Sequence, residues 1–125
     1  MDLTQKKLVP CERSTPPMGG EEVKKYLSWL PDGWQAIKDD GPEWSRQDRT
    51  DEARKIHKEF IFKSFREGIQ FVKEVADLAE KENHHPDIFI FYNRVIIELW
   101  THAIGGLSEN DFILAAKIEV LSDKY

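Results

Sequence analysis

Two adjacent histidines and a proline, His84, His85 and Pro86, are the residues of this chain that most clearly invite a chemical explanation. The 125 residues contain only four histidines, so a neighbouring pair is notable. Glu80 precedes His84 by four residues, a spacing that places two side chains on one face of a helix. A carboxylate against an imidazole favours the protonated ring, which is a proton donor near neutral pH. The spacing therefore predicts general acid chemistry at the end of a helix.

Two other interpretations of the histidine pair stay open on local grounds. Pro86 restricts His85 to extended backbone, so the helix is expected to end at or just before His84. A histidine there suits the helix dipole without any chemical role. A zinc site is less favoured, because adjacent histidines on an extended segment diverge and the only cysteine, Cys11, lies far off.

A third histidine, His102, strengthens the chemical interpretation. It follows the second of two apolar, strand-like runs that a turn at Asn93 would join into a hairpin. Because the end of a hairpin returns to its beginning, we expect His102 at the end of its strand and close to His84 and His85. Trp100 would share the strand face of His102, since side chains two residues apart point the same way.

Asp111 is the second candidate carboxylate. It falls in the first turn of the last predicted helix, three residues after the capping residue Ser108. There it can orient one of the imidazoles, or act only as an acidic residue at a positive helix end. Three imidazoles and two carboxylates form an acid–base set, and no serine or cysteine is placed beside them for nucleophilic attack.

The elements that must hold these residues follow from hydrophobic periodicity and from turn residues. In chain order they are a helix at 21–30, strands at 34–37 and 55–62, a helix at 65–83, strands at 88–92 and 95–100, and a helix after Ser108. Ser64 and Glu67 have the spacing of a capping box before the central helix. This order predicts an α+β domain in which hairpin-connected strands form an antiparallel sheet and helices cover one of its faces.

The chain divides into an irregular arm and a single domain. Residues 1–20 are rich in proline and glycine and predict an irregular amino-terminal arm, followed by one domain over 21–125. Between the first two strands, residues 38–55 are polar and predict a long surface loop.

Composition excludes several classes of protein. Hydrophobic residues make up 40% and charged residues 33%, a balance typical of a folded globular chain. The net charge of −5, without a clustered basic stretch, disfavours direct nucleic-acid binding. No apolar run is long enough to span a membrane, and the start of the chain lacks the apolar core of a signal peptide. With a single cysteine, these features predict a cytoplasmic protein.

A longer pattern joins the candidate residues. Glu80 is followed four residues later by His84-His85-Pro86, and then by Tyr92, His102 and Asp111. They lie in the stretches AEKENHHPDIFIFYNRV and THAIGGLSENDFILAAKIE, with LPDGW and FIFKSFREGIQFV upstream. This pattern resembles the pterin-4a-carbinolamine dehydratases, also known as dimerization cofactors of a homeodomain transcription factor. The similarity extends from Glu21 to Leu121, nearly the whole chain.

The resemblance implies a four-stranded antiparallel sheet with three helices packed on one face, which agrees with the order of elements above. It implies a hydro-lyase that dehydrates 4a-hydroxytetrahydrobiopterin to quinonoid dihydropterin, the recycling step of tetrahydrobiopterin after aromatic amino-acid hydroxylation. It implies no metal and no organic cofactor. The expected partners are the pterin substrate, further copies of the chain in a homodimer or homotetramer, and a protein partner, with no direct nucleic acid and no membrane.

The resemblance also assigns roles to residues. His84 would be the general acid toward the leaving 4a-hydroxyl, assisted by Glu80. His102 would be the second acid, serving the opposite stereoisomer, and His85 would mainly hold the substrate. The catalytic set is His84, His85, His102, Glu80 and Asp111, and the substrate-binding set is Asn83, His84, His85, Pro86, Trp100, Thr101, His102 and Ala103.

A protein-interaction or assembly module of the same fold, without catalysis, is the alternative function. Such a module has no need of His84, His85 and His102 together, so the histidine set favours the enzyme. Two departures separate the chain from the compact animal members of the family. Residues 38–55 are a longer segment, and Trp100 replaces a small residue, which would narrow the site.

Overall fold

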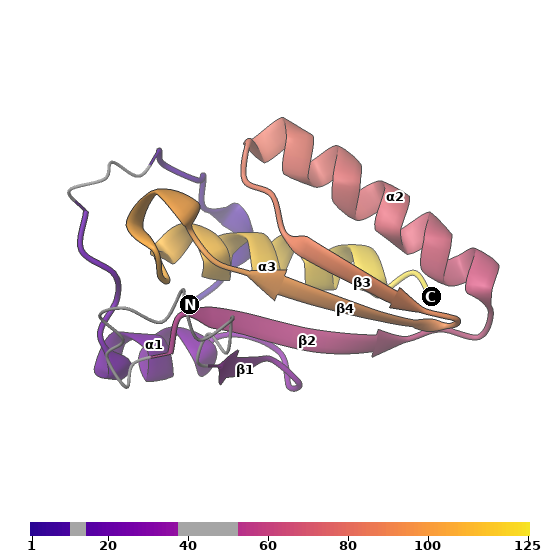
Figure 1. Cartoon of the computed structure of the whole chain (residues 1–125), viewed down its shortest axis with the longest axis horizontal. Coiled ribbons are helices and arrows are strands. Elements are labelled where there is room, and N and C mark those ends of the chain that lie inside the picture. Colours follow the sequence, from indigo (N-terminus) through magenta and orange to yellow (C-terminus); the bar gives the residue numbers. More distant parts are fainter. Residues whose placement is uncertain (11–14, 38–52) are drawn as a thin grey trace, which may run out of the picture.

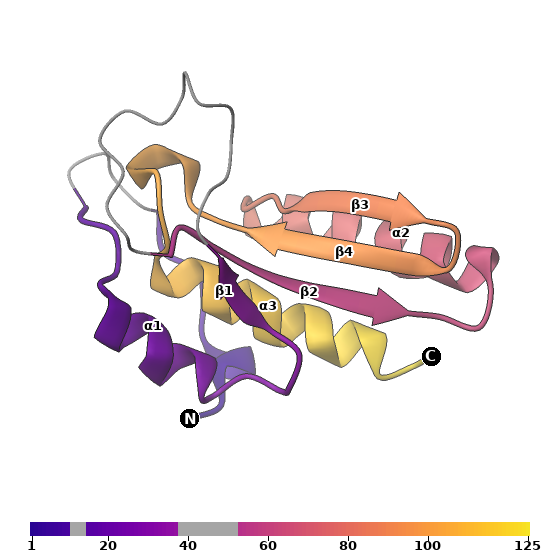
Figure 2. The same cartoon turned by 60° about the horizontal axis from the view of Figure 1, so that its bottom comes forward.

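The fold of the chain is α+β, with a four-stranded antiparallel sheet and three helices over one of its faces (Figure 1 and Figure 2). The computed structural model describes residues 1–10, 15–37 and 53–125. The predicted fold class is confirmed. Cys11 and the predicted surface loop, apart from 53–55, lie outside the described residues.

The helices and strands follow the predicted order. They are η1 (Leu3–Gln5, a 3₁₀ turn), α1 (Gly20–Leu27), β1 (Gln35–Ile37), β2 (Lys55–Ile61), α2 (Phe65–Glu82), β3 (Asp87–Phe91), β4 (Arg94–Leu99), η3 (His102–Ile104, a 3₁₀ turn) and α3 (Glu109–Ser122). The sheet order is β1-β2-β4-β3, so β2 and β4 are central and β1 and β3 are edge strands. None of the helices in the described residues is long and apolar enough to cross a membrane.

The two faces of the sheet differ because side chains alternate along each strand. On the helix side, Ile56 of β2 pairs with Leu99 of β4, and both are fully buried. On the open side, His57 of β2 pairs with Glu98 of β4, and His57 Nδ1 lies 3.7 Å from the Glu98 carboxylate. This alternation of apolar and polar residues determines which face receives the helices.

Helix α3 is buried on nearly every side because it contacts α1, α2 and η1 in addition to covering the sheet. Residues 112–115 are consecutive and fully buried, the pattern of a helix in the middle of a core. Helix α2, by contrast, buries one stripe that includes Phe71, Val75 and Ala79. The first turn of α3, which carries Asp111, is therefore fixed inside the protein.

The amino-terminal arm packs against α3, and its regular element is η1. Leu3 is 1% exposed and belongs to the core. Lys6 Nζ lies 3.0 Å from Glu109 Oε2 at the start of α3. Further along, Met18 donates its backbone N–H to Leu107 O at 2.9 Å. These contacts hold the arm against residues around the start of α3.

Glu109 also joins α1 to α3, because it accepts a hydrogen bond of 2.5 Å from Tyr26 Oη. This bond raises the pKa of Tyr26 to about 12 and, together with Lys6, lowers the pKa of Glu109 below its usual 4.5. A lowered carboxyl pKa adds stability that is present above the unfolded pKa and is lost as the pH falls through the folded pKa. Glu109→Gln is therefore expected to lower the free energy of unfolding at neutral pH, and to have progressively less effect as the pH falls below 4.5.

Urea denaturation of both proteins at about pH 7 and about pH 3 measures this difference. Glu59→Gln, on the open side of the sheet, is the control for loss of an exposed carboxylate. A Glu109→Gln destabilisation that is equal at the two pH values would contradict the assignment to the carboxylate charge.

Candidate active site

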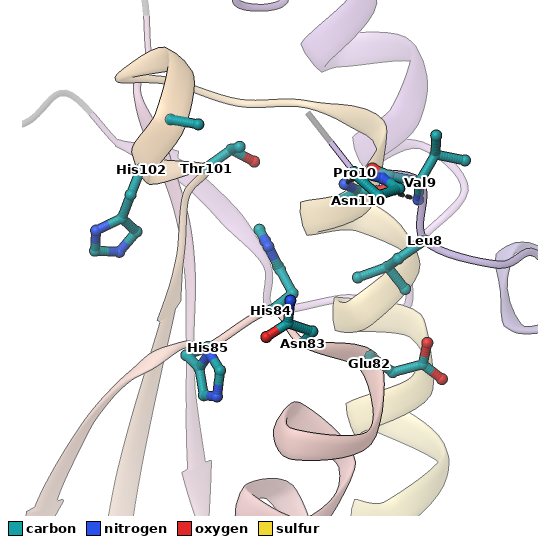
Figure 3. A pocket seen from close by; sticks show the side chains of 11 residues that line it. Leu8, Val9, Pro10, Glu82, Asn83, His84, His85, Thr101, His102 and Asn110 are labelled. Carbon is teal, nitrogen blue, oxygen red and sulfur yellow. Dashed lines mark hydrogen bonds between the residues drawn. The ribbon is translucent and has the colours of Figure 1, made fainter. Parts of the chain in front are cut away.

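Helix α2 ends at Asn83, which turns the chain sharply. Asn83 has a left-handed backbone (φ 52°, ψ 43°), a conformation that asparagine tolerates better than most residues. The N–H of His84 then donates to Ala79 O at 3.1 Å, which closes the last turn. The helix end predicted before His84 is confirmed, and the rings of His84 and His85 point in different directions (Figure 3).

His84 is held by the buried carboxylate of Asp111. Its Nε2 lies 2.6 Å from Asp111 Oδ1, and the His84 side chain is 12% exposed whereas that of Asp111 is fully buried. Because an ionised carboxylate can only accept hydrogen bonds, Nε2 of His84 carries a proton and donates it. Asp111 therefore orients an imidazole, and that imidazole is His84.

Asp111 is itself fixed by the start of α3. Its Oδ2 accepts hydrogen bonds from Thr101 Oγ1 at 2.8 Å and from the Ser108 backbone N–H at 3.0 Å. Ser108 Oγ lies 2.7 Å from Thr101 Oγ1 and must donate to it, since the Thr101 proton is already given to Asp111. Ser108 is the N-cap of α3, as predicted, and forms a capping box with Asp111. The bonds that begin the helix thus also lock the carboxylate toward His84.

The predicted contact between Glu80 and His84 is wrong. Glu80 Oε2 lies 3.2 Å from Nε2 of His85 instead. The left-handed residue Asn83 interrupts the helix before His84, so the four-residue spacing no longer places Glu80 and His84 on one face. The side chains of Glu80 and His85 are 79% and 55% exposed, and an ion pair so exposed to water contributes little.

His102 lies at the first residue of η3 rather than at the end of a strand, which corrects its predicted place. Strand β4 ends at Leu99, and Thr101 then pairs with Gly106 in an isolated bridge that frames η3. From this turn His102 lines the same cavity as Asn83 and His84, which follow α2.

Trp100 supports the His102 ring by stacking. The two ring centres are 3.9 Å apart and the planes are inclined by 23°. The Trp100 indole N–H donates to Asp87 Oδ2 at 3.2 Å, and Lys55 Nζ lies 5.5 Å from the centre of the Trp100 ring. Trp100 is therefore anchored on its own account, and the stack limits how far the His102 imidazole can swing.

One cavity of about 460 Å³ brings the three histidines together (Figure 3). Its volume falls in the range of sites for small organic molecules. The lining residues are Leu8, Val9, Pro10, Glu82, Asn83, His84, His85, Thr101, His102, Ala103 and Asn110. Pro86, Trp100, Glu80 and Asp111 of the predicted site are not part of this lining, and Asp111 acts on the cavity through His84.

Five residues of the lining are missing from the sequence-based set: Leu8, Val9, Pro10, Glu82 and Asn110. The first three belong to the arm, whose irregular sequence shows no periodicity that would place it. For Asn110 the available signal is its position beside Asp111 in the first turn of a helix.

The arrangement is suited to proton transfer by imidazoles. Protonated His84 would use Nε2–H toward Asp111 and have Nδ1–H as a second donor. His85 and His102 add two more titratable rings around the same cavity. Among the described residues, no group of three or more His, Cys, Asp or Glu side chains is placed to hold a metal ion.

Fold and site together define the class: a small α+β protein with a buried carboxylate–imidazole pair at a cavity for a small molecule. The sequence model of the family described as Pterin 4 alpha carbinolamine dehydratase matches residues 16–121, and the chain belongs to this family of hydro-lyases. The family suggested by the sequence pattern is thereby confirmed.

Relatives and a solved structure agree with the family assignment. A relative that carries the family's name, from Alkaliphilus metalliredigens (strain QYMF), is 39% identical over 94% of each chain. Pterin-4-alpha-carbinolamine dehydratase 2, mitochondrial, of Arabidopsis thaliana is 43% identical over 96% of this chain and 59% of that longer protein. The crystal structure of a transcriptional coactivator/pterin dehydratase from Brucella melitensis superimposes with a TM-score of 0.67 at 35% identity, covering 85% of this chain and 98% of that chain.

Proposed function

We propose that the protein dehydrates 4a-hydroxytetrahydrobiopterin to quinonoid dihydropterin and water, a step in the recycling of tetrahydrobiopterin. The observation that carries this proposal is the 2.6 Å contact between His84 and the buried Asp111, at a cavity that His85 and His102 also line. Membership of the dehydratase family and the names of its relatives support the same reaction.

The reaction requires a proton donor more than any other group. The lone pair of the pterin N5 forms the C4a–N5 double bond as the C4a–O bond breaks, and the leaving oxygen takes a proton and departs as water. N5 then releases its own proton, so the pterin loses one water in all. A positioned general acid accelerates such a step by about 10²–10⁴-fold.

His84 is the proposed general acid. Since its Nε2–H is bound to Asp111, the other ring nitrogen, Nδ1, is left to face the 4a-hydroxyl group. The Asp111 carboxylate stabilises the imidazolium that must exist before the transfer. After the transfer, neutral His84 keeps its proton on Nε2, and Nδ1 can take up the proton released from N5. One imidazole and one carboxylate therefore complete the cycle.

His85 is proposed to hold the substrate rather than to protonate it. Its ring lines the cavity, but its partner Glu80 is largely exposed and does not fix it as Asp111 fixes His84. Asn83, Thr101 and Ala103 form the adjoining wall of the proposed binding site. Pro86 and Trp100 contribute to the proposed binding site indirectly. Pro86 restricts the backbone of His85, and Trp100 stacks on the ring of His102.

His102 is proposed as the second acid, for the opposite stereoisomer of the 4a-hydroxyl group. It lines the same cavity from η3, and its ring is held by the stack on Trp100. Trp100→Leu removes this support and is expected to slow one stereoisomer by about tenfold and the other by less than about twofold. His102→Ala should give the same bias. Stopped-flow absorbance with each 4a-hydroxy stereoisomer measures it, and equal losses for both would remove the second-acid role.

The direct test of the proposed reaction is stopped-flow dehydration of chemically generated 4a-hydroxytetrahydrobiopterin. The substrate is mixed with increasing amounts of protein, and its disappearance is followed by absorbance. We expect a rate that rises in proportion to protein concentration above the spontaneous reaction. A rate equal to the spontaneous one at every concentration would rule out the enzyme and leave the interaction module.

Assembly of several copies is also part of the proposal, as the sequence predicts a homodimer or homotetramer. Strand β3 is an edge of the sheet, and its residues Phe89 and Phe91, with Tyr92 beyond, are 43%, 49% and 72% exposed. An apolar, unpaired edge is suited to strand pairing with a second copy. The solved relative described as a transcriptional coactivator supports a protein partner. A cytoplasmic location stays a prediction from the sequence.

A further inference from the structure

The amino-terminal arm supplies one wall of the cavity. Figure 3 shows Leu8, Val9 and Pro10 close to Asn110, on the side of the cavity away from His102. These three arm side chains are apolar, whereas the rest of the lining contains the three imidazoles and the polar residues Glu82, Asn83, Thr101 and Asn110, with Ala103. The cavity therefore has an acid–base side and an apolar side.

The first turn of α3 binds both the arm, on the apolar side of the cavity, and His84, on the acid–base side. Asn110 Oδ1 accepts the Val9 backbone N–H at 2.9 Å, and Asn110 Nδ2 donates to Val9 O at 2.5 Å. The preceding residue, Glu109, forms the ion pair with the arm described above, and the following residue, Asp111, binds His84. The distance between the arm and the proposed acid is thus set by three consecutive residues of one helix.

The arm residues at the cavity lie outside the part of the chain that the family pattern describes. The family model begins to match at residue 16, whereas the apolar wall is formed by residues 8–10. Leu8 is half-buried against the core, whereas Val9 and Pro10 are exposed and Val9 is held by its backbone bonds to Asn110. The arm therefore adds a feature to the site that the family pattern does not specify.

We propose that the arm is a specificity wall, in which Leu8 and Pro10 contact the C6–C7 edge and the 6-substituent of the pterin while Asn110 positions them. This inference deepens the proposed function and rests on it. In a tetrahydropterin the C6–C7 edge is the one ring edge without nitrogen or oxygen, and it lies across its ring from C4a. In this arrangement the 4a-hydroxyl group lies at His84 and the C6–C7 edge is directed to the arm, where the lining is apolar. Apolar contact there strengthens binding of the pterin and leaves proton transfer unchanged.

Two variants test the wall in different ways. Asn110→Ala removes both hydrogen bonds to Val9, and Leu8→Ala removes the apolar side chain while leaving those bonds. Each is expected to raise KM for 4a-hydroxytetrahydrobiopterin about five- to tenfold with kcat within about twofold of wild type. Leu8→Ala should also reduce the preference for a 6-methyl over a 6-unsubstituted substrate by about threefold or more. Lys7→Ala, an exposed neighbour outside the cavity lining, is the matched control and should change neither.

Binding of oxidised biopterin, a stable fluorescent pterin, measures the wall without turnover. Its Kd is expected to rise about five- to tenfold in both variants, whether or not the wild type dehydrates the substrate, so failure of the wall and failure of the proposed reaction are distinguishable. If Asn110→Ala loses its circular dichroism signal, Leu8→Ala decides alone. Unchanged KM, Kd and 6-substituent preference in Leu8→Ala would overturn the wall. A fall in kcat at unchanged KM would overturn it too, because the arm would then act on the acid.

Discussion

Replacing His84 by alanine is expected to lower kcat for dehydration by about 10²–10⁴-fold, the range that a general acid contributes. The reason is that the leaving oxygen would depart as hydroxide or wait for a proton from water. KM is expected to change less, because Asn83, His85 and the arm still line the cavity. Single-turnover stopped-flow at saturating substrate measures the chemical step without interference from product release.

His57→Ala is the matched control for loss of an imidazole. His57 lies on the open face of the sheet, where it contacts Glu98 and Gln35, and it is not part of the cavity lining. Its kcat is expected to stay within about twofold of wild type. Comparable losses in the His57 and His84 variants, or a His84→Ala kcat above about a tenth of wild type, would show that His84 is not the acid.

Much of the fold could be predicted because its elements carry local signals at their ends. Ser64 accepts a hydrogen bond from the Glu67 N–H at 3.1 Å, which is one half of the predicted capping box, and the Glu67 carboxylate accepts from the Lys63 N–H at 3.3 Å. Asn93 sits in the hairpin turn and bonds Phe62 O at 2.9 Å through its side chain. Alternation along β2 and β4 determined the buried face. The helix start and the strand alternation each lie within a short stretch of sequence, whereas at Asn93 the sequence suggests the turn and not the bond to Phe62, 31 residues away.

The site could be predicted less completely because its decisive contacts join distant parts of the chain. His84 and Asp111 are 27 residues apart, and the pattern that contains both does not say that they touch. Local spacing instead favoured Glu80 as the partner, and one left-handed residue, Asn83, was enough to break that geometry. The periodicity of hydrophobic residues does not indicate where a single residue, such as Asn83, adopts a positive φ.

The arm illustrates the same limit more strongly. Val9 and Asn110 are 101 residues apart and exchange two hydrogen bonds. Val9 belongs to an irregular segment and Asn110 to the first turn of a helix. Neither local sequence therefore predicts a contact with the other residue. The contact forms because α3 is the central helix of the core, and the central position of α3 depends on the packing of all the other elements.

Asp111→Asn is expected to lower kcat by about 10²-fold or more while leaving the fold intact. The Thr101 hydroxyl and the Ser108 N–H both donate to Asp111 Oδ2. The single carbonyl oxygen of asparagine must therefore take that place, which leaves its NH₂ group facing His84 Nε2. Two N–H groups cannot share that contact, so the proton of neutral His84 moves to Nδ1 and the imidazolium is disfavoured. The variant keeps every side chain in place but removes the acid.

The tautomer itself can be observed, which separates this prediction from a simple loss of stability. In ¹⁵N NMR of the histidine rings, wild-type His84 should carry its proton on Nε2 and the Asp111→Asn protein on Nδ1. Asp123→Asn, at the exposed C-cap of the same helix, is the matched control and should alter neither the His84 signals nor kcat. If His84 stayed protonated on Nε2 in the Asp111→Asn protein, or if kcat fell by less than about threefold, the buried carboxylate would not be what prepares the acid. A shifted tautomer together with a large loss of kcat would instead tie catalysis to the contact between His84 and Asp111.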